Sequence, residues 1–513
     1  MAFANFFFRE EQALCQVTGV NDTSFLQAKL SSTMVAVAFD DEGCISENGR
    51  IILELAMNLM ARMYPRLGVL NMGANDHSVK TYQMLIGLAR EINPNIEIVF
   101  DSCLTYQSVI CVGRPSVCSN RSFYLSANSW NVEVSADRPG SGLTGDVFNP
   151  ISAAAAACFG CAEVFKQLFS DYLVRSEPSS FVLSLLTLRK EVDHSEEMPP
   201  IVFKDVTFVG LGAIGTAAIW CLSKLKAMEG NITLVDPEEI DLSNLQRYIL
   251  SLQSNVGESK VMVAHQAFQQ SSISVQAYNL PFGDYVTQYR KECIFDVIAV
   301  SVDNVPDRMA SQAVLPRVAI NAWTREDGWL GVSDHRLGSS QACLACLYLE
   351  TAIQKSQAEI VAELTGFDPK QAAEMLVQKS ILTAELLSEI ATKRGYDLEQ
   401  IRRWEGKTLD MFYVEAVCGG ILIKTGGENK QALVPLPHQS ALAGVLLACQ
   451  VVKEALGRIE LDSPVSASLS IVERLPDYIP QRRAKKRNCI CQDPDYQEVY
   501  REKYGISNDI SPK

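Results

Sequence analysis

The segment Asp205-Val-Thr-Phe-Val-Gly210-Leu-Gly212-Ala-Ile-Gly215 is the most informative part of this chain about its fold. The apolar run before Gly210 is typical of a buried strand, and a helix is predicted from Ile214 to Lys226. The first glycine permits a tight turn, the second lets backbone approach a phosphate, and the third lets helix pack on strand. Asp236 ends the next strand, where an acid can bind ribose hydroxyls. The spacing predicts a nucleotide-binding loop; the alternative is a glycine-rich turn of purely structural use.

Helical and strand-like segments alternate on both sides of this loop, which is typical of a parallel sheet with crossover helices. A charged segment that ends in two prolines, 188–200, predicts a linker. The Ala/Glu/Leu/Lys-rich text from Thr351 to Leu409 predicts a helical insertion. The other expected elements are strand-like runs at 68–72, 95–100, 231–235, 295–301 and 318–320 and helices at 50–66 and 81–92.

Two small-residue helices are similar to each other late in the two halves of the chain. Ser152 to Lys166 and Ser440 to Lys453 are both rich in alanine and contain glycine and cysteine. Two explanations stay open. Any tightly packed helix favours small residues, or the chain holds two copies of one α/β unit, packed face to face, of which only the second keeps its glycine loop.

Composition excludes several classes of protein. The 513 residues are 47% apolar and 21% charged, which excludes disordered and fibrous chains. A net charge of −14 argues against sequence-independent nucleic-acid binding. The longest apolar run, around 151–165, is Ala-rich and expected to be too short to span a membrane, and the first residues lack a basic signal-peptide region. Fifteen cysteines in such a chain are expected to be thiols, metal ligands or a nucleophile, and we expect a cytoplasmic protein.

Polar and charged residues after the loop favour a triphosphate over a dinucleotide. A triphosphate must be neutralised by basic side chains and a metal. Arg247 and Lys260 can neutralise phosphates, and Asp303 offers a hard oxygen ligand for Mg²⁺. Each residue alone could be a solvated surface charge, but their order after the glycine loop favours a shared site.

The combination GLGAIG, VDPEEIDLSNLQR, GESK and SVDN resembles the ThiF/MoeB/HesA-like adenylating enzymes and the ubiquitin-activating enzymes, over about Lys204 to Cys491. One departure is Tyr248, where the family usually has Gln after the Arg. The resemblance implies that Gly210, Gly212 and Gly215 line the ATP phosphates, Asp236 binds the ribose, Asn244, Arg247 and Lys260 contact the triphosphate and Asp303 binds magnesium.

The cysteines carry two further expectations. Cys343-Leu-Ala-Cys346 alone could be a redox pair, half of a zinc site or chance. Family members often combine such a pair with a distant second pair around structural zinc, which implies a site with Cys489 and Cys491, although one intervening residue there departs from the usual two. Cys418, in Glu415-Ala-Val-Cys-Gly-Gly420, looks like the nucleophilic loop cysteine of ubiquitin-activating enzymes.

The resemblance therefore implies an α/β fold of two Rossmann-like ThiF-type units, the first degenerate and the second active. It implies ATP-dependent adenylation of a ubiquitin-like protein, a thioester on Cys418 and transfer to a conjugating enzyme. The chain would be a monomeric pseudo-dimer or a homodimer, most like the activating enzymes of bacterial antiphage (Bil-type) operons. Arg9 and Arg50 are candidates for an arginine that completes the site from the first unit. Alternatives are a sulfur-carrier adenylyltransferase of the molybdopterin or thiamin type and a non-catalytic scaffold. The expected domains are 1–187 (inactive), 188–200 (linker), 201–350 with 411–492 (active), 351–410 (helical insertion) and 493–513 (tail).

Overall fold

The protein forms two compact units, Met1–Leu349 with Pro435–Lys513 and Glu350–Val434. In the first unit we distinguish an N-terminal half (residues up to 187) and a C-terminal half (from residue 201). The computed structural model describes residues 2–20, 22–140, 142–173, 178–194, 196–325, 327–349, 357–394, 396, 398–413, 434–459, 465–473 and 479–506.

The N-terminal half is a seven-stranded sheet of order β3-β2-β1-β4-β5-β6-β7 with helices on its faces. The first five strands in this order run parallel, and β6 and β7 are antiparallel additions. The elements are α1 Phe7–Thr18, α2 Thr23–Ser32, β1 Val35–Phe39, α3 Asp41–Ile45, α4 Glu47–Met63, β2 Arg66–Asn71, α5 Asp76–Ile92, β3 Glu97–Val99, β4 Ser108–Val112, β5 Ser122–Asn128, β6 Asn131–Ala136, α6 Pro150–Leu168, η1 Ser170–Tyr172 and β7 Phe181–Ser184.

The C-terminal half is an eight-stranded sheet of order β10-β9-β8-β11-β12-β13-β14-β15, parallel up to β12 and antiparallel beyond it. The elements are β8 Ile201–Val209, α7 Ala213–Ser223, β9 Met228–Val235, η2 Leu242–Gln246, η3 Gln253–Asn255, α8 Lys260–Gln266, β10 Ser274–Tyr278, α9 Phe282–Tyr289, β11 Val297–Val300, α10 Val305–Ala313, β12 Val318–Thr324, β13 Trp329–His335, α11 Leu344–Tyr348, α17 Pro437–Ala455, β14 Ser466–Ser470, β15 Ile479–Gln481, η6 Ile490–Gln492 and α18 Pro494–Tyr504.

The two halves repeat one topology, which explains the similarity of their small-residue helices. In the N-terminal half β1 lies between β2 and β4, and in the C-terminal half β8 lies between β9 and β11. In each half an antiparallel strand pair (β5–β6 or β12–β13) precedes the small-residue helix (α6 or α17), and this helix leads to the next strand of the same sheet (β7 or β14). The predicted α/β fold of two Rossmann-like units is thereby confirmed. The antiparallel strands were not expected, because both faces of β13 are largely buried and its sequence lacks a strict alternation.

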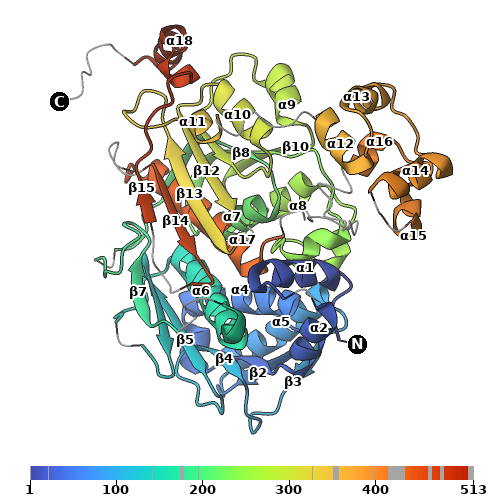
Figure 1. Ribbon diagram of the computed structural model, residues 1–513. Coiled ribbons are helices and arrows are strands. Elements are labelled where there is room, and N and C mark those ends of the chain that lie inside the picture. The colour runs from blue at the N-terminus through green and yellow to red at the C-terminus, as the bar shows by residue number, and fades with distance from the viewer. Residues whose placement is uncertain are drawn as a thin grey trace. The chain divides into compact units, whose positions relative to one another are not determined.

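Four helices pack between the two sheets (Figure 1): α4 and α6 from the N-terminal half, α7 and α17 from the C-terminal half. Their packing is reciprocal. Lys166 on α6 donates to Glu473 O of the C-terminal half at 3.1 Å, and Lys453 on α17 donates to Leu186 O of the N-terminal half at 2.7 Å. Both lysines lie sixteen residues after the proline that begins their helix, so the contacts repeat in register as well as in kind.

The 19-residue α6 is long and apolar enough to cross a membrane by length and composition, which corrects the expectation that this run is too short. Most of its apolar window is buried inside the fold, against α4, α17 and β5. The predicted helix at 50–66 is α4, which begins earlier than expected, because Ser46 Oγ accepts from Gly49 N and caps it. It ends at Met63, near Pro65 where a stop is expected, since a residue before proline disfavours helical backbone.

The second unit is helical where it is described. Trp404, Phe412, Leu387 and Ile390 are fully buried in its own hydrophobic core. It contains the whole predicted insertion, 351–410, and continues to Val434. Its elements are α12 Gln357–Thr365, α13 Pro369–Val377, α14 Ala384–Arg394, α15 Leu398–Ile401, η4 Arg402–Trp404 and α16 Leu409–Tyr413.

Candidate nucleotide-binding site and cysteine cluster

The glycine loop connects β8 to α7 with the geometry that the sequence predicts. Gly210 has φ of +88°, a left-handed conformation that favours glycine. A Cβ on Gly215 would overlap the carbonyl oxygen of Gly210, so this glycine lets the helix pack against the turn. A Cβ on Gly212 would meet a single heavy atom of the described chain within 4 Å, the Tyr248 hydroxyl at 3.5 Å. No described side chain caps α7 at Gly212, which leaves the first N–H groups of the helix for an anion.

Asp236, directly after β9, is tied to this loop. Its Oδ2 accepts from Leu211 N at 2.6 Å and its Oδ1 accepts from Glu238 N at 2.9 Å. Burial raises the pKa of Asp236, and the charge of Lys260 acts in the opposite direction. The carboxylate therefore ends the second strand beside the first turn, the position expected of a ribose-binding acid.

Lys260, at the start of α8, is a buried cation, 3% exposed. Its Nζ is paired with the Glu238 carboxylate and lies 5.2 Å from the centre of the Tyr248 ring. Burial on its own lowers the pKa of Lys260, but Tyr248, Asp236 and Glu238 together outweigh burial and raise it above the usual value. The ammonium group therefore stays charged, as a phosphate partner must.

The segment around η2 carries the other phosphate candidates. Asn244 closes a capping box, in which its Oδ1 accepts from Asp241 N at 3.0 Å. Arg247 follows η2, is half-buried, and places its guanidinium 5.7 Å from the centre of the Tyr248 ring. Asn244, Arg247 and Lys260 are thus brought to one loop system around Tyr248.

Asp303 lies at the same edge of the sheet. It is exposed and follows Ser301, whose Oγ donates to Gly210 O at 2.7 Å. Since β9, β8 and β11 are parallel neighbours, the residues that follow each strand leave the sheet at one carboxyl edge. The structure brings the predicted ribose, phosphate and magnesium residues together there, and their roles toward ATP stay predictions.

A buried arginine of the N-terminal half holds the loop that carries Arg247. Arg62 on α4 donates to Leu245 O, and also to Ser251 O at 3.0 Å and to Asn58 Oδ1 at 3.0 Å. Asn58 in turn donates to Ile249 O at 2.9 Å. Burial lowers the pKa of Arg62 to about 9. The N-terminal half therefore supports the loop at 245–251, a role that no local sequence pattern indicates.

Arg9 on α1 is the second contribution of the N-terminal half. The side chain is 3% exposed, and its Nε has no hydrogen-bond partner in the described structure. Burial and the charge of Arg247 lower the pKa of Arg9 to about 10, with Asp241 and Tyr248 acting in the opposite direction. Of the two arginines considered from the sequence, Arg9 thus faces the candidate site. Arg50 instead donates to Cys44 O and Ile45 O within its own half.

The corresponding loop of the N-terminal half is occupied by its own carboxylates. Asp40 accepts from Gly43 N at 3.0 Å and from Arg114 N at 2.8 Å, and Asp41 accepts from Ala74 N at 3.0 Å. A Cβ on Gly49 would overlap Gly43 O, so the helix-packing glycine is still present. This half keeps the turn, and its two aspartates accept hydrogen bonds from main-chain N–H groups after three neighbouring strands, β1, β2 and β4. The prediction that this half is degenerate stays a prediction.

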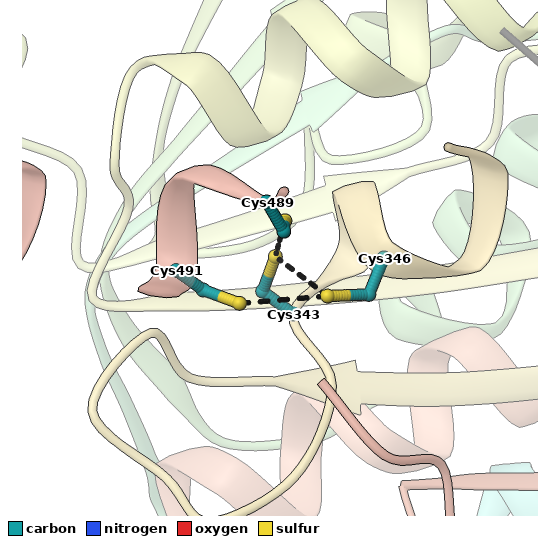
Figure 2. A group of neighbouring side chains, drawn as sticks. All are labelled: Cys343, Cys346, Cys489 and Cys491. Atoms are coloured by element: carbon teal, nitrogen blue, oxygen red, sulfur yellow. Dashed lines mark hydrogen bonds between the residues drawn. The ribbon is translucent and has the colours of Figure 1, made fainter. Parts of the chain in front are cut away.

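The four predicted zinc ligands converge on one place (Figure 2). Cys343, Cys346, Cys489 and Cys491 are all buried, and their sulfurs lie within 4.8 Å of one another. The pairs Cys343–Cys489 and Cys346–Cys491 are each separated by 3.4 Å. A tetrahedral site with Zn–S distances of about 2.3 Å has sulfurs about 3.8 Å apart, so the cluster fits this ion closely. Cys489 directly precedes the 3₁₀ turn η6, which contains Cys491, and this turn brings the two closely spaced cysteines to the same cluster.

Backbone atoms complete the surroundings of the cluster. Lys486 N donates to Cys346 Sγ at 3.2 Å, and the described cysteines elsewhere in the chain are free thiols. Hydrogen bonds from the neighbouring thiols lower the pKa of Cys346, with that of Cys343 first among them. Cys418, the predicted nucleophile, lies outside the described residues.

Comparison with known proteins identifies two sequence families. The model described as "ThiF family" matches residues 191–491, more than half of the chain. The model described as "Prokaryotic E2 family C" matches residues 38–170.

Individual relatives fall into three groups. The "Uncharacterized protein y4jF" of Sinorhizobium fredii is 34% identical over 527 residues and covers 100% of this chain and 99% of its own. A molybdopterin-synthase adenylyltransferase of Haemophilus influenzae is 27% identical, over 34% of this chain and 81% of its own. The NEDD8-activating enzyme E1 catalytic subunit of Caenorhabditis elegans is 34% identical, over 18% of this chain and 23% of its own. Among solved structures, E. coli MccB with AMPCPP and MccA is similar at 17% identity and a TM-score of 0.34, over 56% of this chain and 66% of that one.

Proposed function

The chain belongs to the ThiF family, and from this premise we propose that it adenylates the C-terminal carboxylate of a small ubiquitin-like or sulfur-carrier protein. One observation carries the proposal. The glycine loop, Asp236, Lys260, Arg247 and Asp303 gather at one carboxyl edge. A buried arginine of the other half, Arg9, lies near Arg247, and its Nε has no hydrogen-bond partner among the described residues. Relatives described as adenylyltransferases support an activity of this class.

In the proposed reaction a carboxylate oxygen of the substrate attacks the α-phosphorus of ATP. The bond from that phosphorus to the bridging oxygen breaks, and pyrophosphate leaves. The product is an acyl-adenylate. The protein contributes positioning and neutralisation of charge: main-chain N–H groups of α7, Lys260 and Arg247 for the phosphates, and Asp303 for Mg²⁺.

We further propose that the thiolate of Cys418 attacks the acyl carbonyl and releases AMP, and that the thioester passes to a conjugating enzyme. The repeated topology of the two halves supports a pseudo-dimer within one chain, whose N-terminal half completes the ATP site instead of a second protomer. Structural zinc at the cysteine cluster, a cytoplasmic location and a place in a bacterial antiphage conjugation system belong to the same proposal.

A second candidate is a conjugating role for residues 38–170, which the description "Prokaryotic E2 family C" favours. The strand order of this half repeats that of the ThiF half, which supports a structural role instead. The exposed cysteines Cys103 and Cys118 offer a direct check. A reducible adduct mapped to either of them by mass spectrometry would favour the conjugating role.

The adenylation is tested by ATP–pyrophosphate exchange with ubiquitin-like proteins encoded beside this gene. Gly212→Ala is the informative variant. Its Cβ would meet only the Tyr248 hydroxyl among the described atoms, at an ordinary contact distance, so the fold should tolerate it. The same Cβ would occupy the place beside the glycine loop where we propose that a phosphate binds. We expect the variant to fold and to lose exchange. Gly87→Ala on α5, where a Cβ has no described neighbour within 4 Å, is the matched control and should exchange normally. Wild-type protein that binds no Mg-ATP would overturn the proposal.

The thioester is tested separately on non-reducing gels. The wild type should form a substrate adduct that thiol reagents remove, and Cys418→Ala should form none while it keeps pyrophosphate exchange. Exchange without any adduct in the wild type would favour the sulfur-carrier adenylyltransferase. Substrate binding without exchange would favour the scaffold.

A further inference from the structure

Tyr248 lies in the middle of the candidate nucleotide site. It follows Arg247, is 5% exposed, and its backbone N donates to Asn244 O at 3.0 Å. This is the position at which the chain departs from the Gln usual in the family.

The phenol stands among three cations. The Lys260 ammonium lies 5.2 Å, and the Arg247 guanidinium 5.7 Å, from the centre of its ring, within the range of cation–π attraction. Tyr248 also affects the pKa of Arg9, which shows that the arginine from the N-terminal half is near it. A glutamine has no ring face to offer, so these cation–π contacts depend on the tyrosine.

The hydroxyl points at the glycine loop. It lies 3.5 Å from the place that a Cβ on Gly212 would occupy, and it is the one described heavy atom within 4 Å of that place. In the described part of the chain the hydroxyl has no hydrogen-bond partner. The N-terminus of the 11-residue α7 begins at the same glycine without a side-chain cap. An unpaired donor and an uncapped helix thus face one space from two sides.

We infer that the Tyr248 hydroxyl donates a hydrogen bond to a phosphate oxygen of the nucleotide bound over Gly212, while its ring holds Arg247 and Lys260 beside the same phosphates. The inference rests on the proposed function and deepens it. Tyr248 would then bind the phosphates directly, instead of only packing at the position where the family usually has glutamine.

Tyr248→Phe tests the hydroxyl alone. Because that oxygen has no partner among the described residues, the variant should unfold at the wild-type temperature. A hydrogen bond to a charged group is worth enough that its loss should weaken binding of Mg-ATP about tenfold in calorimetry. Binding of adenosine, which lacks phosphates, should change less than twofold. Tyr248→Leu, which also removes the ring face, should weaken Mg-ATP further, and Tyr289→Phe, at an exposed tyrosine of α9, should bind like the wild type.

The outcomes separate the two proposals. Wild-type protein that binds no Mg-ATP would overturn the proposed function and this inference with it. Wild-type binding with equal affinity in Tyr248→Phe would overturn the inference alone. An equal loss for adenosine and Mg-ATP would also overturn it, because the tyrosine would then shape the site as a whole without contacting phosphate.

Discussion

The Nε2 of Gln246 donates a hydrogen bond to Oε2 of Glu10 across 2.7 Å, although the two residues are 236 positions apart and both side chains are completely buried. Gln246 also donates to Pro435 O at 3.3 Å. One side chain therefore joins three segments: α1 of the N-terminal half, the loop that carries Arg247, and the backbone before α17. The remaining carboxyl oxygen of Glu10 has no partner among the described residues, so the group is poorly suited to carry a charge.

We expect Glu10→Gln to flatten the pH dependence of stability. Burial raises the pKa of Glu10 from 4.5 to about 8, so the folded protein keeps a proton that the unfolded chain releases within this window. The free energy of unfolding therefore falls as pH rises from 4.5 to about 8, by about 1.4 kcal/mol for each unit of pKa difference. Gln cannot ionise and can still accept from Gln246. The variant should match the wild type near pH 5 and exceed it by a few kcal/mol near pH 8.5.

Urea denaturation at both pH values measures this difference. Glu11→Gln, at the half-exposed neighbour on α1, is the matched control and should leave the fall of stability with pH in place. If the stability of Glu10→Gln falls with rising pH as steeply as that of the wild type, the buried Glu10 carboxyl group does not cause the pH dependence.

The structure also shows which parts of the site were within reach of sequence reasoning. The β8–α7–β9 unit is local: its apolar run, three glycines and Asp236 lie within residues 205–236, so pattern and chemistry agree over a short stretch. The four cysteines were predicted as one site only through the family resemblance, because Cys343 and Cys346 alone leave a redox pair or chance open. Their burial together is a finding of the structure.

Contributions across the halves were not predictable in this way. Arg62 contacts Leu245 over a separation of 183 positions, and its own helix shows only an ordinary apolar period. Arg9 was a candidate without evidence, since a single arginine near the N-terminus matches no motif. Such roles depend on how α1 and α4 pack on the second sheet, and packing between distant segments leaves no periodic signal in either one.

Replacement of Arg62 by Met should weaken both the fold and the nucleotide site. The change keeps the length of the side chain but leaves Leu245 O and Ser251 O buried without their donor, at a cost of roughly 2–4 kcal/mol. Since these carbonyls flank Arg247, we also expect a higher KM for ATP in pyrophosphate exchange. Arg62→Lys should restore part of both effects because it keeps a cationic donor.

Arg50→Met on the same helix is the control for Arg62. This arginine bonds to Cys44 O at 3.2 Å and Ile45 O at 3.1 Å in its own half, so its loss should leave the KM for ATP unchanged. Equal KM values for Arg62→Met and the wild type would show that the loop at 245–251 keeps its shape without α4.

The cysteine cluster should hold one zinc ion per chain, measured by metal analysis of the purified protein. Cys491→Ala should lose the ion, and a strong chelator should lower the unfolding temperature of the wild type but not that of the variant. The tail should loosen with it, because α18 docks through Tyr500, whose hydroxyl donates to Arg317 O at 3.0 Å. Cys293→Ala, at a half-buried free thiol outside the cluster, is the control. The prediction would be contradicted if the purified wild type contained no metal, or if removal of the metal left its unfolding temperature unchanged.

Replacement of Arg9 by Ala should have opposite effects on the stability of the ligand-free protein and on the binding of Mg-ATP. Two cations, Arg9 and Arg247, lie near each other with the Nε of Arg9 unpaired, so like-charge repulsion and burial both oppose the free state. Removal of Arg9 should therefore keep or slightly raise the unfolding temperature without ligand. A bound triphosphate would supply the missing anion, so the same change should shrink the stabilisation by Mg-ATP and raise the KM for ATP about tenfold. Differential scanning calorimetry with and without Mg-ATP measures both effects. A variant that is less stable without ligand, yet stabilised by Mg-ATP as strongly as the wild type, would mean that Arg9 supports α1 and never contacts the nucleotide.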